Sequence, residues 1–216
     1  MCGGGMSAYV RVVAFIDWNS QLLAYSNGAA PIDAARRVFE KVSRNVARSL
    51  AGEFPASRFV VDLRLYHGWH KGFEPTANRK AIVQVVSSAD FPTLSPRPTN
   101  VIFSGDVRYG DCLLVALERR IHGRLGIHLP NTLRSQDRRG EFTEKMVDTA
   151  LASDLVAHAA RDRSSWLMVV AEDDDFIPPL FAAEALFAGS KSNVVLLRKR
   201  TASPFYNLDD ILKGVP

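Results

Sequence analysis

The stretch that decides the fold is VRVVAFID at residues 10–17, which is followed directly by WN. The run is almost wholly apolar and rich in β-branched residues, and it ends abruptly in the carboxylate of Asp17. A run without alternating polar residues is typical of a strand that is buried on both faces of a parallel sheet. The sequence therefore predicts a buried strand with an acid at its carboxyl end.

Helical and strand-like patterns alternate outward from this strand. After Pro31, apolar residues recur at helical spacing with charged residues between them. Strands are predicted at 59–66, 101–107, 166–171 and 193–198, and helices at 31–50, 76–89, 112–121, 143–160, 178–188 and 208–213. This order predicts an α/β fold, a mainly parallel sheet with helices on both faces. We expect a single domain over residues 7–216, preceded by a short flexible N-terminus at 1–6.

Composition narrows the class of protein. The chain has 216 residues, of which 47% are hydrophobic, so a disordered chain is excluded as the main state. Cys2 and Cys112 are too few for a disulfide framework or a four-cysteine zinc site. Lacking a signal peptide and a long apolar run, the sequence is expected to be soluble, cytoplasmic and not bound to a membrane. The net charge of +4 is compatible with a polyanionic partner.

Carboxylates follow two of the predicted strands. Asp17 ends the first, and WLMVVA at 166–171 runs into EDDDF at 172–176. Acids favour helix N-termini, but that preference explains one or two of them and not four in a row. Close carboxylates repel by roughly 4 kcal/mol per pair at an effective dielectric of about 20, unless cations or protons neutralise them. A hard divalent cation such as Mg²⁺ or Mn²⁺ is the economical explanation.

A third group of acids lies on the predicted helix 143–160. Asp148 lies in its first turn with Lys145 just before it, and Asp154 falls in the middle of the apolar stripe. A buried carboxylate is costly without a partner. Either a buried partner such as an arginine satisfies Asp154, or the stripe borders a polar cleft that holds a metal.

Three segments together resemble a known family. They are FIDWN at 15–19, EKMVDTALASDL at 144–155 and LMVVAEDDDFIPPLFAAEALFAGS at 167–190. In this order they resemble the NYN domain, a branch of the PIN-like nuclease superfamily with a Rossmann-like architecture. The resemblance implies an Mg²⁺- or Mn²⁺-dependent ribonuclease. The positions that match the family's site are Asp17, Lys145, Asp148, Asp154, Asp173 and Asp175.

Some positions depart from the family pattern. Ser20 stands where the family often has an asparagine, and the nearby asparagine is Asn19. Glu172 and Asp174 replace a glycine and a small polar residue, which makes the turn more acidic. The SGD at 104–106 looks like the family turn, but it precedes the helix with Asp148, so we interpret Asp106 as a loop acid.

The acids suit hydrolysis of a phosphodiester, because carboxylates without histidine or cysteine ligands bind Mg²⁺ or Mn²⁺, and such ions activate water and stabilise in-line displacement. The residues predicted to bind metal are Asp17, Asp148, Asp154, Asp173 and Asp175, and all except Asp154 are also predicted to be catalytic. The predicted cofactor is therefore Mg²⁺ or Mn²⁺.

The predicted partner is RNA, single-stranded or structured. The predicted substrate-binding residues are Trp18, Asn19, Lys145, Arg138 and Arg139. Trp18 is expected to stack on a base, with Tyr66 and Trp69 as alternatives. Lys145 either contacts the scissile phosphate or balances a carboxylate. A second basic cluster, Arg198 to Arg200, ends the last strand.

Other functions remain open at this point. A non-catalytic RNA-binding or regulatory module with the same fold is the main alternative, and a homo-oligomer is compatible with the sequence. A haloacid-dehalogenase type phosphohydrolase is disfavoured, because it needs a second acid where Asn19 stands.

Overall fold

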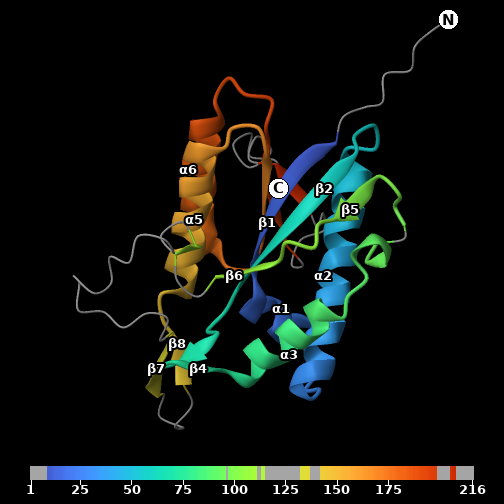
Figure 1. Ribbon diagram of the computed structural model, residues 1–216. Helices are drawn as coiled ribbons and strands as arrows, with labels where there is room; N and C mark the ends of the chain where they lie inside the picture. The colour runs from blue at the N-terminus through green and yellow to red at the C-terminus, as the bar shows by residue number, and fades with distance from the viewer. Residues whose placement is uncertain are drawn as a thin grey trace, which may run out of the picture.

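A central, mainly parallel β-sheet organises the chain (Figure 1). The computed structural model describes residues 9–95, 97–110, 113–114, 132–136, 142–198 and 205–207, with only the backbone at 134–136 and 205–207. The strands of the sheet are β1 (Val10–Asp17), β2 (Phe59–Tyr66), β5 (Val101–Phe103), β6 (Arg108–Gly110), β9 (Trp166–Val170), β10 (Val194–Leu197) and β11 (Phe205–Asn207). Their order is β11-β10-β9-β1-β2-β5, and β6 also pairs with β2.

β1 lies in the middle of the sheet and pairs in parallel on both sides. Val12 is opposite Val61 of β2 and opposite Trp166 of β9. β5 and β6 each pair in parallel with a different half of β2, β10 pairs in parallel with β9, and β11 runs antiparallel to β10. All the strands from β10 to β5 therefore present their carboxyl ends at the same edge.

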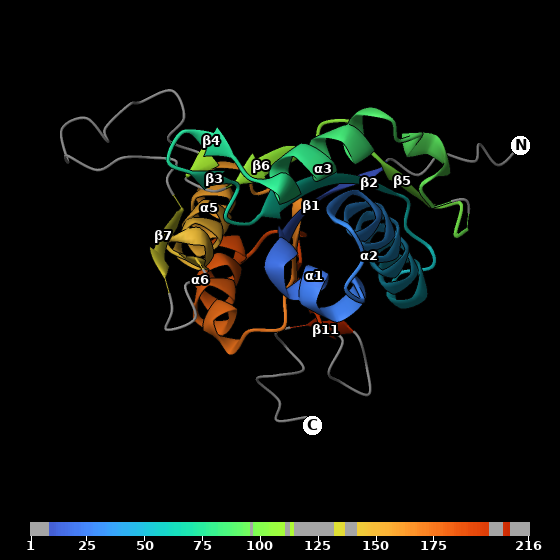
Figure 2. The ribbon, with the colours of Figure 1, turned by 90° about the horizontal axis from the view of Figure 1, so that it is seen from below.

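Helices cover both faces of the sheet, as Figure 2 shows from below. They are α1 (Trp18–Tyr25), α2 (Pro31–Glu53), α3 (Ala77–Ser87), α5 (Val147–Arg161) and α6 (Ile177–Phe187). Alternate residues of β1 point to opposite faces, because successive side chains of a strand alternate. Val12 and Ala14 join the core formed with α2 and α3, whereas Val13 and Phe15 join the core formed with α5 and α6.

Two small hairpins lie beside the main sheet at its carboxyl edge, where α1 and α3 also begin (Figure 1). One consists of β3 (His70–Lys71) and β4 (Glu74–Pro75), and the other of β7 (Leu133–Gln136) and β8 (Phe142–Glu144). Short 3₁₀ helices, η1 (Phe91–Thr93) and η3 (Asp174–Phe176), complete the elements of the described residues.

The predicted α/β class with a mainly parallel sheet and helices on both faces is confirmed. The strands predicted at 10–17 and 59–66 have the observed bounds, and the helix predicted from Pro31 begins there. The predicted helices at 112–121 and 208–213 lie outside the described residues. Over the described residues, no helix combines the length and the apolarity needed to cross a bilayer.

The start of the helix with Asp148 was predicted wrongly. Residues 142–144 form β8, and α5 begins only at Val147, so Lys145 precedes the helix. The pairing of β8 with β7 explains the difference, because it withdraws these residues from the helix. Helix α1, which begins directly after β1 with Asp17 as its N-cap, was not predicted from the sequence.

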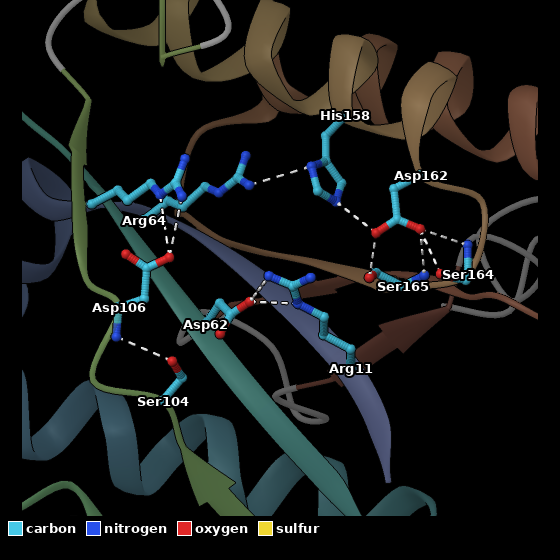
Figure 3. A network of polar contacts seen from close by, with 10 residues as sticks. Arg11, Asp62, Arg64, Ser104, Asp106, His158, Asp162, Ser164 and Ser165 are labelled. Carbon is cyan, nitrogen blue, oxygen red and sulfur yellow. Dashed lines mark hydrogen bonds and ion pairs between the residues drawn. The ribbon is translucent and has the colours of Figure 1, made fainter. Parts of the chain in front are cut away.

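A polar network lies near the C-terminal end of α5 (Figure 3). The guanidinium of Arg64 lies 3.3 Å from His158 Nδ1, and His158 Nε2 lies 3.7 Å from Asp162. Desolvation, reinforced by the charges of Arg64 and Arg11, lowers the pKa of His158 to about 4. Asp106, interpreted above as a loop acid, forms an exposed ion pair with Arg108 at 3.3 Å.

Met146 allows a test of the backbone before α5, because its φ of 72° is in the left-handed region. That region costs an L-residue roughly 1–2 kcal/mol and is worst for β-branched side chains. We expect Met146→Val to lower the free energy of unfolding by about 1–2 kcal/mol, and Met146→Gly to leave it within about 1 kcal/mol of wild type. Urea denaturation in EDTA measures both, and equal losses for both variants would contradict the left-handed conformation.

His158 predicts a pH dependence of stability. Because its folded pKa of about 4 lies below the ordinary value of 6.5, the unfolded chain binds a proton between these pH values and the folded protein does not. Stability is therefore lost as the pH falls from about 6.5 to 4, by up to about 3 kcal/mol. We expect His158→Gln to remove this loss in urea denaturation across that range. His70→Gln serves as the control, and a wild-type slope in His158→Gln would contradict the assignment.

Candidate active site

Acidic residues lie at the carboxyl edge of the sheet around β1, where successive crossover connections go to opposite sides of this strand. From β1 the chain crosses to β2 on one side, while β9 lies on the other side of β1, with Ile16 opposite Val170. In open α/β sheets, ligands bind outside the carboxyl ends of the strands at such a switch point. Asp17 ends β1 and Asp173 follows β9, so these two acids flank the switch point.

Asp17 is a buried acid with a structural role of its own. Its side chain is 8% exposed and accepts a hydrogen bond from the backbone amide of Ser20 at 3.2 Å, which caps α1. Burial raises the pKa of Asp17; the hydrogen bonds from Ser20 oppose this, and the charge of Glu144 adds to it. The first turn of α1 thus holds this carboxylate at the end of β1.

The acidic turn after β9 is held from two sides. Asp173 caps η3 by accepting the amide of Asp175 at 3.0 Å, and both side chains are exposed. Arg198, at the end of β10, forms an ion pair with Asp174 and donates to the carbonyl oxygen of Glu172 at 3.4 Å. Arg198 therefore supports the turn, and Asp173 and Asp175 are left facing solvent.

Asp148 brings the third element into the site. It lies in the first turn of α5 on the solvent side. Partial desolvation and the charges of Asp17, Glu144, Asp173 and Asp175 raise the pKa of Asp148 to about 6. The charges of four other carboxylates thus act on Asp148. We call these five residues the acidic cluster.

Glu144 was not predicted to belong to this cluster. It lies at the end of β8, where its carboxylate accepts the backbone amide of Gly68 at 2.6 Å and contacts His67 Nδ1. Desolvation raises the pKa of Glu144, but the contacts with His67 and Gly68 outweigh it and lower the pKa below its ordinary value. No local sequence pattern marks Glu144, because the β7–β8 hairpin brings it to the site.

Asp154 has hydrogen-bond partners of its own inside the core. It is fully buried, and its Oδ2 accepts hydrogen bonds from the Tyr66 hydroxyl and from the backbone amide of Leu114, each at 2.8 Å. A buried partner therefore accounts for Asp154, although the partners are a tyrosine and an amide and not an arginine. The prediction that Asp154 binds metal has no support in these contacts.

The predicted substrate-binding residues have different outcomes. Asn19 and Lys145 are exposed, and no ion pair among the described residues involves Lys145. The stacking role of Trp18 was predicted wrongly, because its ring is fully buried in the core beside α2 and has no face for a base. Tyr66 and Trp69 are also fully buried, so their rings are equally unable to stack on a base. Arg138 and Arg139 lie outside the described residues.

The donor chemistry of the acidic cluster fits a hard divalent cation. All five side chains offer carboxylate oxygens, which are the ligands that Mg²⁺ and Mn²⁺ prefer. Over the part of the chain that the structure describes, no three acidic, histidine or cysteine side chains stand close enough to form a ready-made metal site. Binding an ion would therefore require the exposed side chains of Asp148, Asp173 and Asp175 to turn towards Asp17.

Comparisons with known proteins leave the family open. The chain matches no model of a known protein family, and no curated protein is significantly similar to it in sequence. The resemblance to the NYN domain therefore depends on the three quoted segments alone.

The raised pKa of Asp148 predicts how this residue affects stability. Its folded pKa of about 6 lies above the ordinary 3.8, so the folded protein binds more protons between pH 4 and 6. The ionised carboxylate destabilises the fold above pH 6, and this penalty disappears as the pH falls to 4. In EDTA at pH 7, we expect Asp148→Asn to be more stable than wild type by on the order of 1 kcal/mol, allowing for solvent screening.

Urea denaturation at pH 4, 5, 6 and 7 measures this difference, which should vanish at pH 4. Asp33→Asn is the control, because Asp33 is an exposed acid in the first turn of α2 that pairs with Arg36. If Asp148→Asn is instead less stable than wild type at pH 7, then Asp148 stabilises α5 through the helix dipole.

Proposed function

We propose that the protein is a ribonuclease that depends on Mg²⁺ or Mn²⁺ and cleaves RNA at the acidic cluster. The observation that carries the proposal is the convergence of carboxylates from β1, β9 and the start of α5 at the switch point of the sheet. The family resemblance supports the same function.

The residues that would hold an ion are Asp17, Asp148, Asp173 and Asp175. A bound divalent ion supplies an activated water and neutralises charge on the phosphate during in-line displacement. Asp17 and Asp173 are preorganised by their caps on α1 and η3, whereas Asp148 and Asp175 are exposed and free to adjust. The exposed ammonium of Lys145 lies three residues before Asp148, where it is suited to contact a phosphate oxygen of the substrate.

Two exposed aromatic rings replace Trp18 as candidates for stacking on bases. Phe142 lies two residues before Glu144 in β8, and Lys71 Nζ lies 3.6 Å from the centroid of its ring. Phe73, in the turn between β3 and β4, is 75% exposed. Unpaired bases stack on such rings at about 1–3 kcal/mol per base, so single-stranded RNA is the favoured substrate.

A non-catalytic RNA-binding module is the second candidate. It is favoured by the absence, over the described residues, of three acidic side chains that already stand at ligand distance. In that case the acids would serve as caps of α1 and η3, and the basic and aromatic groups would still bind RNA.

Cleavage of a labelled single-stranded RNA tests the proposal. We expect cleavage with Mg²⁺ or Mn²⁺ and none in EDTA. Asp148→Asn and Asp173→Asn should each lower the cleavage rate by about 100-fold or more. A loss of this size exceeds the one typical of residues that only support a metal's direct ligands. Asp106→Asn is the matched control, because Asp106 is an exposed acid paired with Arg108.

RNA affinity, measured by fluorescence anisotropy in EDTA and compared with the cleavage result, separates the ribonuclease from the non-catalytic RNA-binding module. Cleavage that persists in EDTA would overturn the metal mechanism. Tight RNA binding without cleavage under any metal condition would favour the non-catalytic module.

A further inference from the structure

Glu144 occupies a seat formed by the loop after β2. The backbone amide of Gly68 donates to Glu144 Oε1 at 2.6 Å. A Cβ atom at Gly68 would lie 3.0 Å from this same oxygen and 2.9 Å from a methyl carbon of Leu133. A Cβ atom there would press on both side chains, so the carboxylate of Glu144 would have to shift by a few tenths of an ångström.

His67 closes the seat from the other side. Its Nδ1 contacts Glu144 Oε1, and its Nε2 lies 2.8 Å from the side-chain amide of Asn78, at the start of α3. The ring also packs edge-on against Trp69, with 4.9 Å between the centroids. An imidazole whose Nε2 accepts from Asn78 carries its proton on Nδ1, which faces Glu144. The ring of His67 is thus held by Asn78 and Trp69, and its Nδ1 lies against Glu144.

This seat engages only one oxygen of Glu144. Among the described residues, the hydrogen bonds and the ion pair of Glu144 all involve Oε1, and Oε2 has no such partner. The seat lies beside the end of β1, because Tyr66, two residues before Gly68, pairs with Asp17. One oxygen is therefore anchored near Asp17, while the other makes no hydrogen bond or ion pair among the described residues.

We propose that Glu144 is a further carboxylate of the active site, which offers Oε2 to the divalent ion or to its water, and that His67 is the residue that positions it. This inference rests on the proposed function, because it assigns Glu144 to the same metal-dependent site. The pattern of an anchored carboxylate supported by an outer hydrogen-bond partner is common around metal ions. In the alternative, Glu144 and His67 only attach the β7–β8 hairpin to the sheet.

Mn²⁺ affinity, measured by isothermal titration calorimetry without RNA, tests this inference independently of cleavage. We expect Glu144→Gln to weaken Mn²⁺ binding by about 10- to 100-fold. Gly68→Ala should cause a similar loss without changing any charge, because it displaces the carboxylate from its seat. Gly105→Ala and Glu74→Gln are the matched controls, since a Cβ at Gly105 meets only ordinary contacts with Phe91, and Glu74 is exposed in β4.

Two substitutions of His67 test its positioning role. Asparagine places an amide donor close to where Nδ1 stands, whereas the amide of glutamine extends towards the place of Nε2. We expect His67→Asn to keep the Mn²⁺ affinity within a few-fold of wild type, and His67→Gln to lose about 10-fold. In cleavage assays, His67→Gln should lower kcat and leave KM for RNA unchanged.

The outcomes separate this inference from the proposed function. If Asp148→Asn abolishes Mn²⁺ binding while Glu144→Gln and Gly68→Ala bind as wild type does, the proposed function stands and the inference is overturned. If wild type itself binds no Mn²⁺ at millimolar concentration, both are overturned. If Glu144→Gln does not fold in EDTA, Gly68→Ala and His67→Gln decide, because both retain the carboxylate.

Discussion

The parallel pairing of β1 with β2 on one side and with β9 on the other is the constraint on which the rest of the structure depends. It forces the connecting helices onto opposite faces, so that α2 and α3 complete one core and α5 and α6 the other. It also makes the strands end at one edge. Asp17 and Asp173, which are far apart in the sequence, thereby follow two neighbouring strands at the same edge of the sheet.

The negative charge that the acidic cluster concentrates at this edge lowers the stability of the fold. Three of its five carboxylates are held by local contacts: Asp17 by its cap on α1, Asp173 by its cap on η3, and Glu144 by Gly68 and His67. Arg198 offsets part of the charge through Asp174. Sites that assemble like charges are strained when empty, and strain of this kind is typical of functional sites.

The sequence predicted those features that depend on local pattern. Residues 10–17 were predicted to the residue, because a strand buried on both faces has no polar interruption and ends at an acid. Asp154 was placed correctly on the buried face of its helix by the helical period. Asp173 and Asp175 were singled out because four adjacent carboxylates after a strand have no sufficient explanation as caps.

Features that depend on distant pairing could not be read in this way. The burial of Trp18 follows from how α1 packs against α2, and the late start of α5 follows from the β7–β8 pairing. Glu144 enters the site through the same hairpin. In each case the residue's environment is created by a segment that lies elsewhere in the chain.

The buried hydrogen bond between Tyr66 and Asp154 has a consequence for the motions of α5. Sliding the helix by one residue would rotate it by about 100° and leave the carboxylate unpaired in the core, which costs several kcal/mol. Gly110 leaves the space that the ring of Tyr66 occupies, because a Cβ there would lie 2.2 Å from the ring. The middle of α5 should therefore exchange its amide hydrogens only on global unfolding, whereas its first turn, with Asp148, opens locally and lets the site adjust without loss of the fold.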